Sequence, residues 1–187
     1  MMINIAGVDE AGRGPLIGPV VAAAVILPKD YDLPFLTDSK KLSERKREVL
    51  AQQIKASALA WHIAFVSAQQ IDEINILQAT LKAMTMAVDG LTMPPEHVLV
   101  DGNRLPKWDY SSEALVKGDL KEPAISAASI LAKVARDAWM HELHDQHPEY
   151  QFANHKGYGT KAHLEAIKKY GILAEHRRSF KPVRERL

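Results

Sequence analysis

Short apolar runs alternate with longer segments of helical periodicity along this chain. Runs of mostly apolar residues, bounded by turn-forming residues, predict buried strands over 3–9, 19–27, 59–66, 97–100 and 114–116. Apolar positions that recur about every three to four residues predict helices over 43–57, 67–91, 123–147 and 160–170. Because strands and helices intermingle without a linker between them, we expect one α/β domain over residues 1–187, built on a partly antiparallel sheet.

Serine residues mark the beginnings of two predicted helices. Ser43 precedes the helix that ends near residue 57, and this helix is expected to bury Val49, Leu50 and Ile54 on one face. Ser67 begins a capping-box pattern before the next helix, whose periodicity allows a break before residue 91. These signals fix the helix starts more closely than periodicity alone.

The composition is that of an ordinary globular chain. Of the 187 residues, 47% are hydrophobic and 25% are charged, which excludes a disordered or collagen-like chain. Cysteine is absent, so a disulfide, a zinc–cysteine centre and a thiol nucleophile are excluded. The N-terminus lacks the pattern of a signal peptide, and the longest apolar stretch, Val20 to Leu27, is too short to span a bilayer. We therefore expect a cytoplasmic protein with no membrane partner.

The formal net charge of +1 hides an asymmetry along the chain. Residues 151–187 contain nine Lys and Arg but three Asp and Glu, so the first 150 residues carry a net negative charge. A basic helical C-terminal segment over about 150–187 can simply have a solvated face, or it can bind a polyanion. Under the second interpretation Arg177, Arg178 and Lys181 contact phosphates and supply affinity for nucleic acid.

Acidic side chains stand at the ends of predicted strands or in the turns that follow them. Asp9 and Glu10 end the first strand, Asp101 follows the fourth and Asp119 follows the fifth. Carboxylates without histidine or cysteine suit hard cations such as Mg²⁺ or Mn²⁺. The charge of Asp9 is costly after a wholly apolar strand unless it has a partner, which favours a metal site there.

Each of the other acids also has an ordinary structural interpretation. Asp101 can be a turn residue, and Asp119 can be a loop residue before a helix. Asp137, on the long predicted helix, lies four residues after Lys133, where a surface ion pair is the usual arrangement. Adjacent side chains of a strand point to opposite faces, so Asp9 and its neighbour can share one site only if the strand breaks nearby. The Ala-Gly pair at 11–12 supplies such a break.

A glycine-rich loop and two basic loops are further candidates for binding. The loop Gly12-Arg13-Gly14 lies between two strands, unlike a dinucleotide or Walker loop, but its glycines allow close approach of the backbone to a ligand. Lys40 stands in a basic loop at 38–41. Lys156 precedes Tyr158, an aromatic between glycines that can stack on a sugar or base. Singly, each of these can be an ordinary surface loop.

Six segments stand together in a fixed order: GVDEAGRG (7–14), DSKKLS (38–43), LVDGN (99–103), LVKGD (115–119), AASILAKVARD (127–137) and HKGYGTKAH (155–163). In this order they closely resemble bacterial ribonuclease HII over essentially the whole chain. The resemblance implies a ribonuclease H-like fold, a mixed five-stranded sheet flanked by helices with a helical C-terminal part. It also implies cleavage of the RNA strand of RNA–DNA hybrids and nicking of duplex DNA 5′ to an embedded ribonucleotide, leaving 5′-phosphate and 3′-hydroxyl ends.

The resemblance also implies roles for individual residues. Its divalent-metal site, for Mn²⁺ or Mg²⁺, corresponds to four catalytic acids: Asp9, Glu10, Asp101 and Asp119. Its substrate contacts correspond to the backbone of the loop at 12–14, which surrounds the 2′-hydroxyl, and to Tyr158, which packs on the next deoxyribose. Lys40 and Lys156 are further expected substrate contacts, and Asp137 is a candidate supporting residue.

Two alternatives differ from this assignment. The related type III enzyme carries an N-terminal substrate-binding extension, whereas only eight residues precede Asp9 here. A non-catalytic nucleic-acid-binding relative would have no need to gather carboxylates next to a polyanion, which is unfavourable without metal. We expect a monomer whose partners are RNA–DNA hybrids and ribonucleotide-containing duplex DNA.

Overall fold

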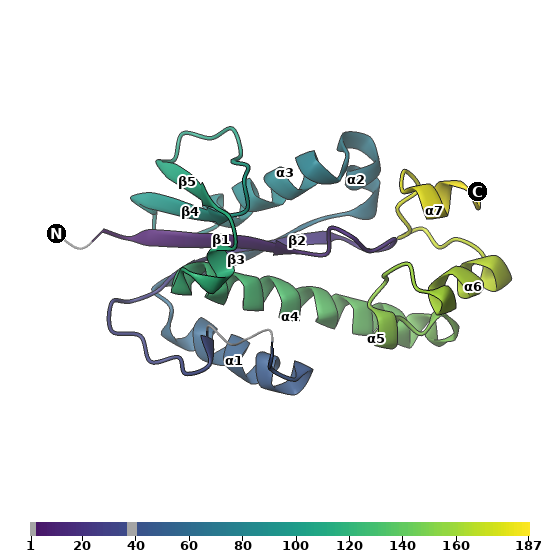
Figure 1. The fold of residues 1–187 in the computed structure, drawn as a ribbon, viewed down its shortest axis with the longest axis horizontal. Coiled ribbons are helices and arrows are strands. Elements are labelled where there is room, and N and C mark those ends of the chain that lie inside the picture. The colour runs from purple at the N-terminus through teal and green to yellow at the C-terminus, as the bar shows by residue number, and fades with distance from the viewer. Residues whose placement is uncertain (1–2, 37–40) are drawn as a thin grey trace.

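The computed structural model describes residues 3–36 and 41–187, in which five strands form one mixed sheet (Figure 1). The strands are β1 (Ile5–Ala11), β2 (Val20–Ile26), β3 (Ala60–Val66), β4 (His97–Asp101) and β5 (Ser112–Leu115). Their order across the sheet is β3-β2-β1-β4-β5. Strands β1, β4 and β5 are parallel, while β2 is antiparallel to both of its neighbours. All five predicted strands are confirmed, with shifts of a few residues at their ends.

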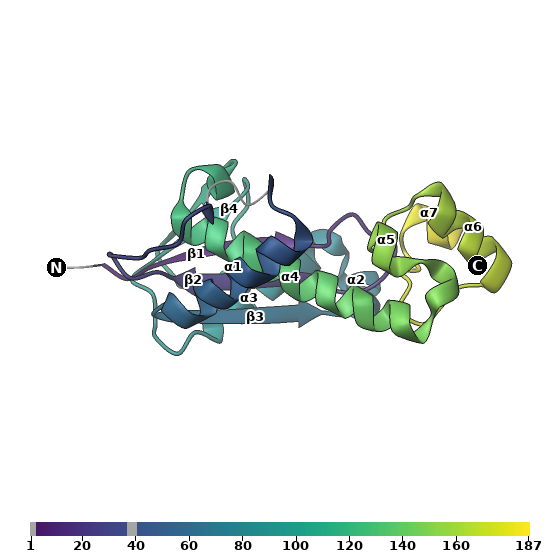
Figure 2. The same cartoon turned by 90° about the horizontal axis from the view of Figure 1, so that it is seen from below.

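Helices cover both faces of this sheet (Figures 1 and 2). One face carries α1 (Glu44–Ser57) and α4 (Pro123–Gln146), and the other carries α2 (Ala68–Ile74) and α3 (Ile76–Asp89). The remaining elements are η2 (Gly118–Leu120), η3 (Pro148–Tyr150), α5 (Phe152–His155), α6 (Lys161–Tyr170) and α7 (Lys181–Arg184). The expected α/β layer architecture is therefore confirmed.

Strand β2 is apolar throughout because it is buried on both sides. Val21, Ala23 and Val25 pack in the cluster under α1 and α4, whereas the alternate residues Ala22 and Ala24 pack in the cluster under α3. A strand with helices on both faces is a continuous apolar run in the sequence, which explains why apolar and polar residues do not alternate in β2. The small alanines let both helical layers approach the sheet closely.

The predicted helix starts are confirmed at both serines. The Ser43 side chain accepts a hydrogen bond from the backbone N–H of Lys46, and Ser67 accepts one from the N–H of Gln70. The long periodic segment does break, at Asn75, whose φ of 71° ends α2 and begins α3. One detail of the expectation for α1 is wrong, because Val49 is 54% exposed. It lies about 100° around the helix from buried Leu50 and faces solvent.

The C-terminal helices gather beyond the end of the sheet, around the last turns of α4 (Figures 1 and 2). Their apolar cluster includes Met140, Tyr150 and Phe152, together with Ile17 from the β1–β2 connection. That connection is also held by backbone hydrogen bonds, from Leu16 to Gly157 and from Arg177 back to Leu16. The glycine loop and the C-terminal segment therefore form one packed unit. No helix in the described part of the chain is both long and apolar enough to cross a membrane.

Candidate active site

The strand register brings Asp9 and Asp101 together. Val8 of β1 pairs with Val100 of parallel β4, so the next residue of each strand stands at the same edge of the sheet. Asp9 is 6% exposed, and its Oδ1 accepts a hydrogen bond of 2.7 Å from the backbone N–H of Glu10. Burial, followed by repulsion from Glu10 and Asp101, raises the pKa of Asp9 well above its usual value. These carboxyl groups are close enough for the charge of one to disfavour the charge of another.

Glu10 reaches this group although β1 continues past it. The strand extends through Ala11, so the expected break comes later, at Gly12 with a φ of 87°. Beyond Val8 no residue of β4 pairs with β1, so the edge of β1 that carries Glu10 is open on that side. Burial raises the pKa of Glu10, and its Oε2 has no hydrogen-bond partner among the described residues although it is buried.

Asp119 joins the group from the other side of Asp101. It lies in η2, directly after β5, and its backbone N–H donates a hydrogen bond of 3.3 Å to Oδ1 of Asp101. Ser126, in the first turns of α4, donates its hydroxyl to the carbonyl of Asp119 and ties η2 to the helix. Three separate segments, β1, β4 and η2, thus place the four predicted acids at one end of the sheet.

The chemistry of this group fits a hard divalent cation. As the side chains stand, no three histidine, aspartate or glutamate side chains of residues 3–36 and 41–187 are close enough together to hold a metal ion. However, the buried Glu10 Oε2 lacks a hydrogen-bond partner among the described residues, and burial together with the neighbouring acids raises the pKa of Asp9. A bound cation would give Glu10 Oε2 a partner and would stabilise the charged form of Asp9. The donors are all carboxylate oxygens, which Mg²⁺ and Mn²⁺ prefer.

Asp137 forms the ion pair that its spacing predicts, but it is not a surface pair. Lys133 Nζ lies 2.9 Å from Asp137 Oδ1, and the aspartate side chain is only 6% exposed. The lysine itself lines the neighbouring pocket, so the buried aspartate holds a basic group at the pocket wall.

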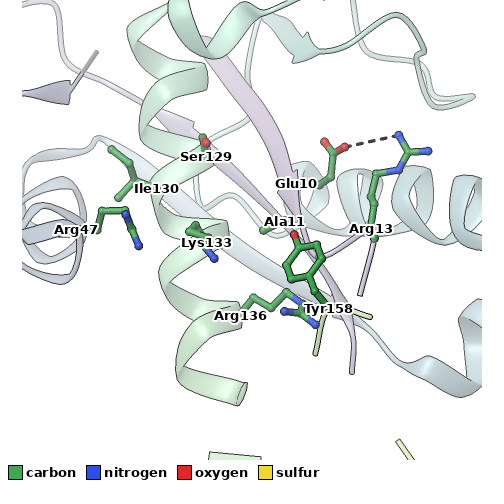
Figure 3. Close-up of a pocket in the computed structure, with 11 residues that line it drawn as sticks. Glu10, Ala11, Arg13, Arg47, Ser129, Ile130, Lys133, Arg136 and Tyr158 are labelled. Carbon is green, nitrogen blue, oxygen red and sulfur yellow. Dashed lines mark ion pairs between the residues drawn. The ribbon is translucent and has the colours of Figure 1, made fainter. Parts of the chain in front are cut away.

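A pocket of about 430 Å³ lies beside Glu10, between the glycine loop, α1 and α4 (Figure 3). Its wall is rich in basic side chains: Arg13, Arg47, Lys133 and Arg136. Arg13 Nη1 lies 3.8 Å from Glu10 Oε1, and the two side chains stand together at one side of the pocket (Figure 3). An acidic group at one end and a basic wall beside it would suit a phosphodiester that approaches through a cation.

Tyr158 closes this pocket opposite the glycine loop. Its side chain is 47% exposed and points into the pocket beside Arg136 (Figure 3). A Cβ at Gly14 would stand 3.3 Å from the tyrosine ring, so glycine at that position leaves the gap between loop and ring open. The structure thus brings together the loop at 12–14 and the predicted aromatic contact.

The two predicted lysines have different outcomes. Lys40 lies outside the described residues. Lys156 does not extend into solvent: its side chain is 13% exposed, and Nζ lies 3.0 Å from Glu44 Oε1 and 2.9 Å from His141 Nε2. It therefore ties the loop of Tyr158 to α1 and α4.

The expectation that Arg177 contacts phosphate is wrong. Arg177 is fully buried, and its guanidinium donates to four backbone carbonyls, those of Gly12, Arg13, Gly18 and Pro19. A cluster of basic residues in the sequence does not show which of them is buried, which explains the error. Arg178, the next residue, is exposed.

Sequence reasoning also missed Arg136, which is 2% exposed. Its guanidinium donates to the carbonyls of Ile17, Pro19 and Lys156, and so links both substrate loops. A signal was present in the sequence. Arg136 stands four residues from Ala132 and from Met140, both on the buried face of α4, and an arginine there needs internal acceptors.

Comparison with known proteins gives consistent matches. A family model described as ribonuclease HII matches residues 6–183. A ribonuclease HII from Neisseria meningitidis serogroup A is 61% identical and is aligned over 100% of this chain and 97% of its own length. One from Alteromonas mediterranea is 60% identical over 96% of this chain and 95% of its own length.

Solved structures agree with the sequence matches. Ribonuclease H2 from Pyrococcus horikoshii OT3 superposes with a TM-score of 0.83 at 28% identity, over 98% of this chain and 97% of that one. A chain of the PCNA:RNase HII complex from Archaeoglobus fulgidus gives 0.82 at 29% identity, over 96% of each chain. A ribonuclease HIII in complex with Mn²⁺ gives 0.68 at 18% identity and covers 69% of its own chain, which shows a shared fold alone.

Proposed function

The chain belongs to the ribonuclease HII family, and we propose that Asp9, Glu10, Asp101 and Asp119 hold the divalent cations of its active site. As a member of that family it is a ribonuclease H, an endonuclease that hydrolyses the RNA strand of RNA–DNA hybrids with the help of divalent metal. The convergence of the four acids from β1, β4 and η2 supports the assignment of the site.

Mg²⁺ or Mn²⁺ is the cation we assign to this site. A related ribonuclease HIII structure contains Mn²⁺, and the oxygen-only donor set here suits either ion. Cations held by Asp9, Glu10, Asp101 and Asp119 would supply the chemistry of an in-line displacement, an activated water molecule and stabilisation of the leaving oxygen. The protein then needs no side-chain nucleophile, consistent with a chain that has no cysteine.

The residues of this chain position the substrate. Arg13 lies beside Glu10, where its guanidinium can hold a phosphate oxygen next to the acids. The buried Asp137 holds Lys133 at the pocket wall, a second positive group for the nucleic-acid backbone. Such contacts orient the scissile phosphodiester and restrain it before reaction.

The preferred substrate under this proposal includes duplex DNA with a single embedded ribonucleotide. The 2′-hydroxyl is the one group that distinguishes a ribonucleotide from its deoxy counterpart, and backbone groups of the loop at 12–14 can contact it because Gly14 leaves the gap open. Tyr158, 47% exposed at the same pocket, packs on the next sugar. Cleavage 5′ to the ribonucleotide leaves a 5′-phosphate and a 3′-hydroxyl.

One assay tests these assignments together. A labelled duplex with one ribonucleotide is incubated with Mg²⁺, with Mn²⁺ or with EDTA, and the products are mapped on a sequencing gel. We expect one nick, 5′ to the ribonucleotide, with either cation and none with EDTA. Binding without cleavage under all conditions would identify a non-catalytic nucleic-acid-binding relative instead. Because one chain supplies every candidate residue, we also expect a monomer, which light scattering after gel filtration checks.

A further inference from the structure

Arg177 is a buried cation whose hydrogen-bond acceptors among the described residues are carbonyl groups and not acids. Its guanidinium lies 2.6 Å from the carbonyl oxygen of Gly12 and 2.9 Å from that of Arg13, with further bonds to Gly18 and Pro19. None of the ion pairs found in residues 3–36 and 41–187 includes Arg177. The ring of Phe180 lies under it, with 5.1 Å from the guanidinium carbon to the ring centre. Its charge is thus shared mainly with the peptide groups of the glycine loop.

Because a peptide group is planar, the direction of a carbonyl that Arg177 binds also fixes the direction of the N–H in the same peptide. In a trans peptide the C=O and N–H bonds point in opposite directions. The carbonyl of Gly12 belongs to the same peptide as the N–H of Arg13, and the carbonyl of Arg13 to that of Gly14. Both carbonyls face the buried guanidinium, so both N–H groups face away from it. Arg177 does not line the pocket, whereas residues 12–14 do.

These two N–H groups are available to a ligand. Neither the Arg13 nor the Gly14 N–H donates a hydrogen bond to another described residue. The φ of 87° at Gly12 is the left-handed value that lets consecutive peptides turn their N–H groups to one side, as in backbone anion-binding loops. A Cβ there would also stand 2.2 Å from the side chain of Arg136, so only glycine fits.

The guanidinium also strengthens these donors. A carbonyl that accepts from a charged group is polarised, and its N–H becomes a better donor through the same peptide. The buried position removes the screening that water would provide. Burial and the neighbouring Arg136 lower the pKa of Arg177 to about 9, so the guanidinium remains charged at neutral pH.

We propose that Arg177 is a positioning residue for ribonucleotide recognition, which aims and polarises the N–H groups of Arg13 and Gly14 toward the 2′-hydroxyl of the ribonucleotide. It acts through the loop and does not touch nucleic acid. This inference rests on the proposed function, because it concerns how the loop distinguishes a ribonucleotide from a deoxyribonucleotide.

The test compares Arg177→Lys with Tyr150→Phe. Lysine retains the charge but loses the planar fork, so it cannot hold several carbonyls at once. Tyr150 is the matched control, since it is also buried in the C-terminal part of the chain and its hydroxyl donates a hydrogen bond of 2.8 Å to the carbonyl of Gly171, away from the glycine loop. Affinity is measured in Ca²⁺, without cleavage, for a duplex with one ribonucleotide and for the all-deoxy duplex of the same sequence.

We expect Arg177→Lys to reduce the preference for the ribonucleotide duplex by about tenfold, the effect of losing one or two charge-assisted hydrogen bonds. Affinity for the all-deoxy duplex should change little. Tyr150→Phe should lower the melting temperature by removing one buried hydrogen bond and should keep most of the preference. An unchanged preference in Arg177→Lys, or an equal loss in both variants, would overturn the proposal. A variant at Arg177 that fails to fold while Tyr150→Phe folds would also overturn it, because Arg177 would then serve the fold as a whole.

Hydrogen exchange of the unmodified protein provides a second measurement. The N–H groups of Arg13 and Gly14 should exchange more slowly with the ribonucleotide duplex bound than with the all-deoxy duplex bound. Equal exchange would overturn the proposal without any variant. The binding preference of the unmodified protein also tests the proposed function independently of the role of Arg177. If it shows no preference for the ribonucleotide duplex, the proposed function at single ribonucleotides fails, whatever Arg177→Lys does.

Discussion

Asp9 and Asp101 are neighbours at the carboxyl ends of two parallel strands. The residues before them, Val8 and Val100, are paired across β1 and β4, so the register itself sets the two acids side by side. Burial first, and then repulsion from Glu10 and Asp101, raise the pKa of Asp9, so this arrangement disfavours the charged carboxylate when no cation is bound. A fold that keeps repelling acids together is typical of a site that works with a cation.

Replacement of either acid by its amide should abolish cleavage and leave the fold intact. Asp9→Asn or Asp101→Asn removes a direct ligand, so the loss should exceed the ~10–100-fold typical of residues behind the ligands. In the absence of metal the melting temperature should stay level or rise, because repulsion between the acids falls. The measurements are single-turnover cleavage and thermal unfolding in EDTA. Asp145→Asn, an exposed acid on α4, is the matched control. Near-normal turnover of Asp9→Asn would remove the metal assignment.

Tyr158→Ala should impair cutting at a single ribonucleotide more than cutting within a long RNA–DNA hybrid. The ring can pack against a flanking deoxyribose only at a junction where a ribonucleotide is followed by a deoxyribonucleotide. Stacking on nucleic acid contributes ~1–3 kcal/mol per base, and a sugar contact should lie near the low end. Rates on the two substrates give the ratio, and Tyr158→Phe should restore most of it. Equal losses on both substrates would argue against a role in reading the junction.

Lys156→Met should act by loosening the loop of Tyr158. Its ammonium is paired with Glu44 and His141, so its removal should raise KM and reduce stability by ~1 kcal/mol or less, as for partly exposed ion pairs. Glu44→Gln should have a similar effect, and the double variant should lose less than the sum. If Lys156 instead contacts phosphate, its loss alone should lower the salt slope of binding by ~0.7–0.9.

Acidification should destabilise the protein through two buried histidines. His163 and His176 are joined by a 3.0 Å contact between their Nε2 atoms, and the chain of bonds continues to the carbonyl of Tyr158. Leu173 N–H donates to Nδ1 of His176, so His176 is neutral and donates from Nε2 to His163. An added proton on His163 would remove that acceptor.

The direction in which stability changes with pH follows from the lowered pKa values of the two histidines. Burial lowers the pKa of His163 to about 4 and that of His176 to about 3, so below pH ~6.5 the unfolded chain binds protons that the native protein does not. Stability should fall as pH decreases from about 6.5 toward 4, by at most ~1.4 kcal/mol per pH unit for each histidine. Urea unfolding from pH 7.5 to 4.5 measures the slope. His176→Asn should make it shallower, whereas His62→Asn on β3 should not. An unchanged slope in His176→Asn would refute this account.

Arg178→Ala should weaken nucleic-acid binding by the basic C-terminal segment without slowing the cleavage step. Unlike Arg177, this side chain is exposed, so it can reach a phosphate. Its loss should lower the salt slope of binding by ~0.7–0.9, raise KM and leave kcat nearly unchanged, because the contact is equal in the ground and transition states. Anisotropy titrations between low and moderate salt provide the slope. Lys29→Ala, an exposed lysine after β2, should change none of these values. A normal slope in Arg178→Ala would place the nucleic acid elsewhere.

The sequence by itself determined the elements and the kind of chemistry. Apolar runs marked all five strands, most clearly β2, where burial on both faces of the sheet requires uninterrupted apolar residues. Ser43 and Ser67 marked helix starts because a local hydrogen bond to the backbone N–H three residues later decides a cap. Asp9 was a candidate ligand because its charge follows an apolar stretch, where it needs a partner. Asp101 and Asp119 were also open to a turn or loop interpretation, and their assignment came from the resemblance of the six ordered segments to the family.

The tertiary structure decided which charges are buried and what they hold. Arg177 looks like any basic residue in the sequence, and the helical spacing that puts Arg136 on the buried face of α4 does not show what it binds. Both are buried because carbonyls from the β1–β2 connection, more than 100 residues away in the chain, accept their hydrogen bonds. Lys156 likewise meets Glu44, a partner 112 residues away. Such partners are set by the packing of α4 and the C-terminal helices against the glycine loop. Local patterns do not contain that information, because the acceptors are backbone atoms that every residue carries.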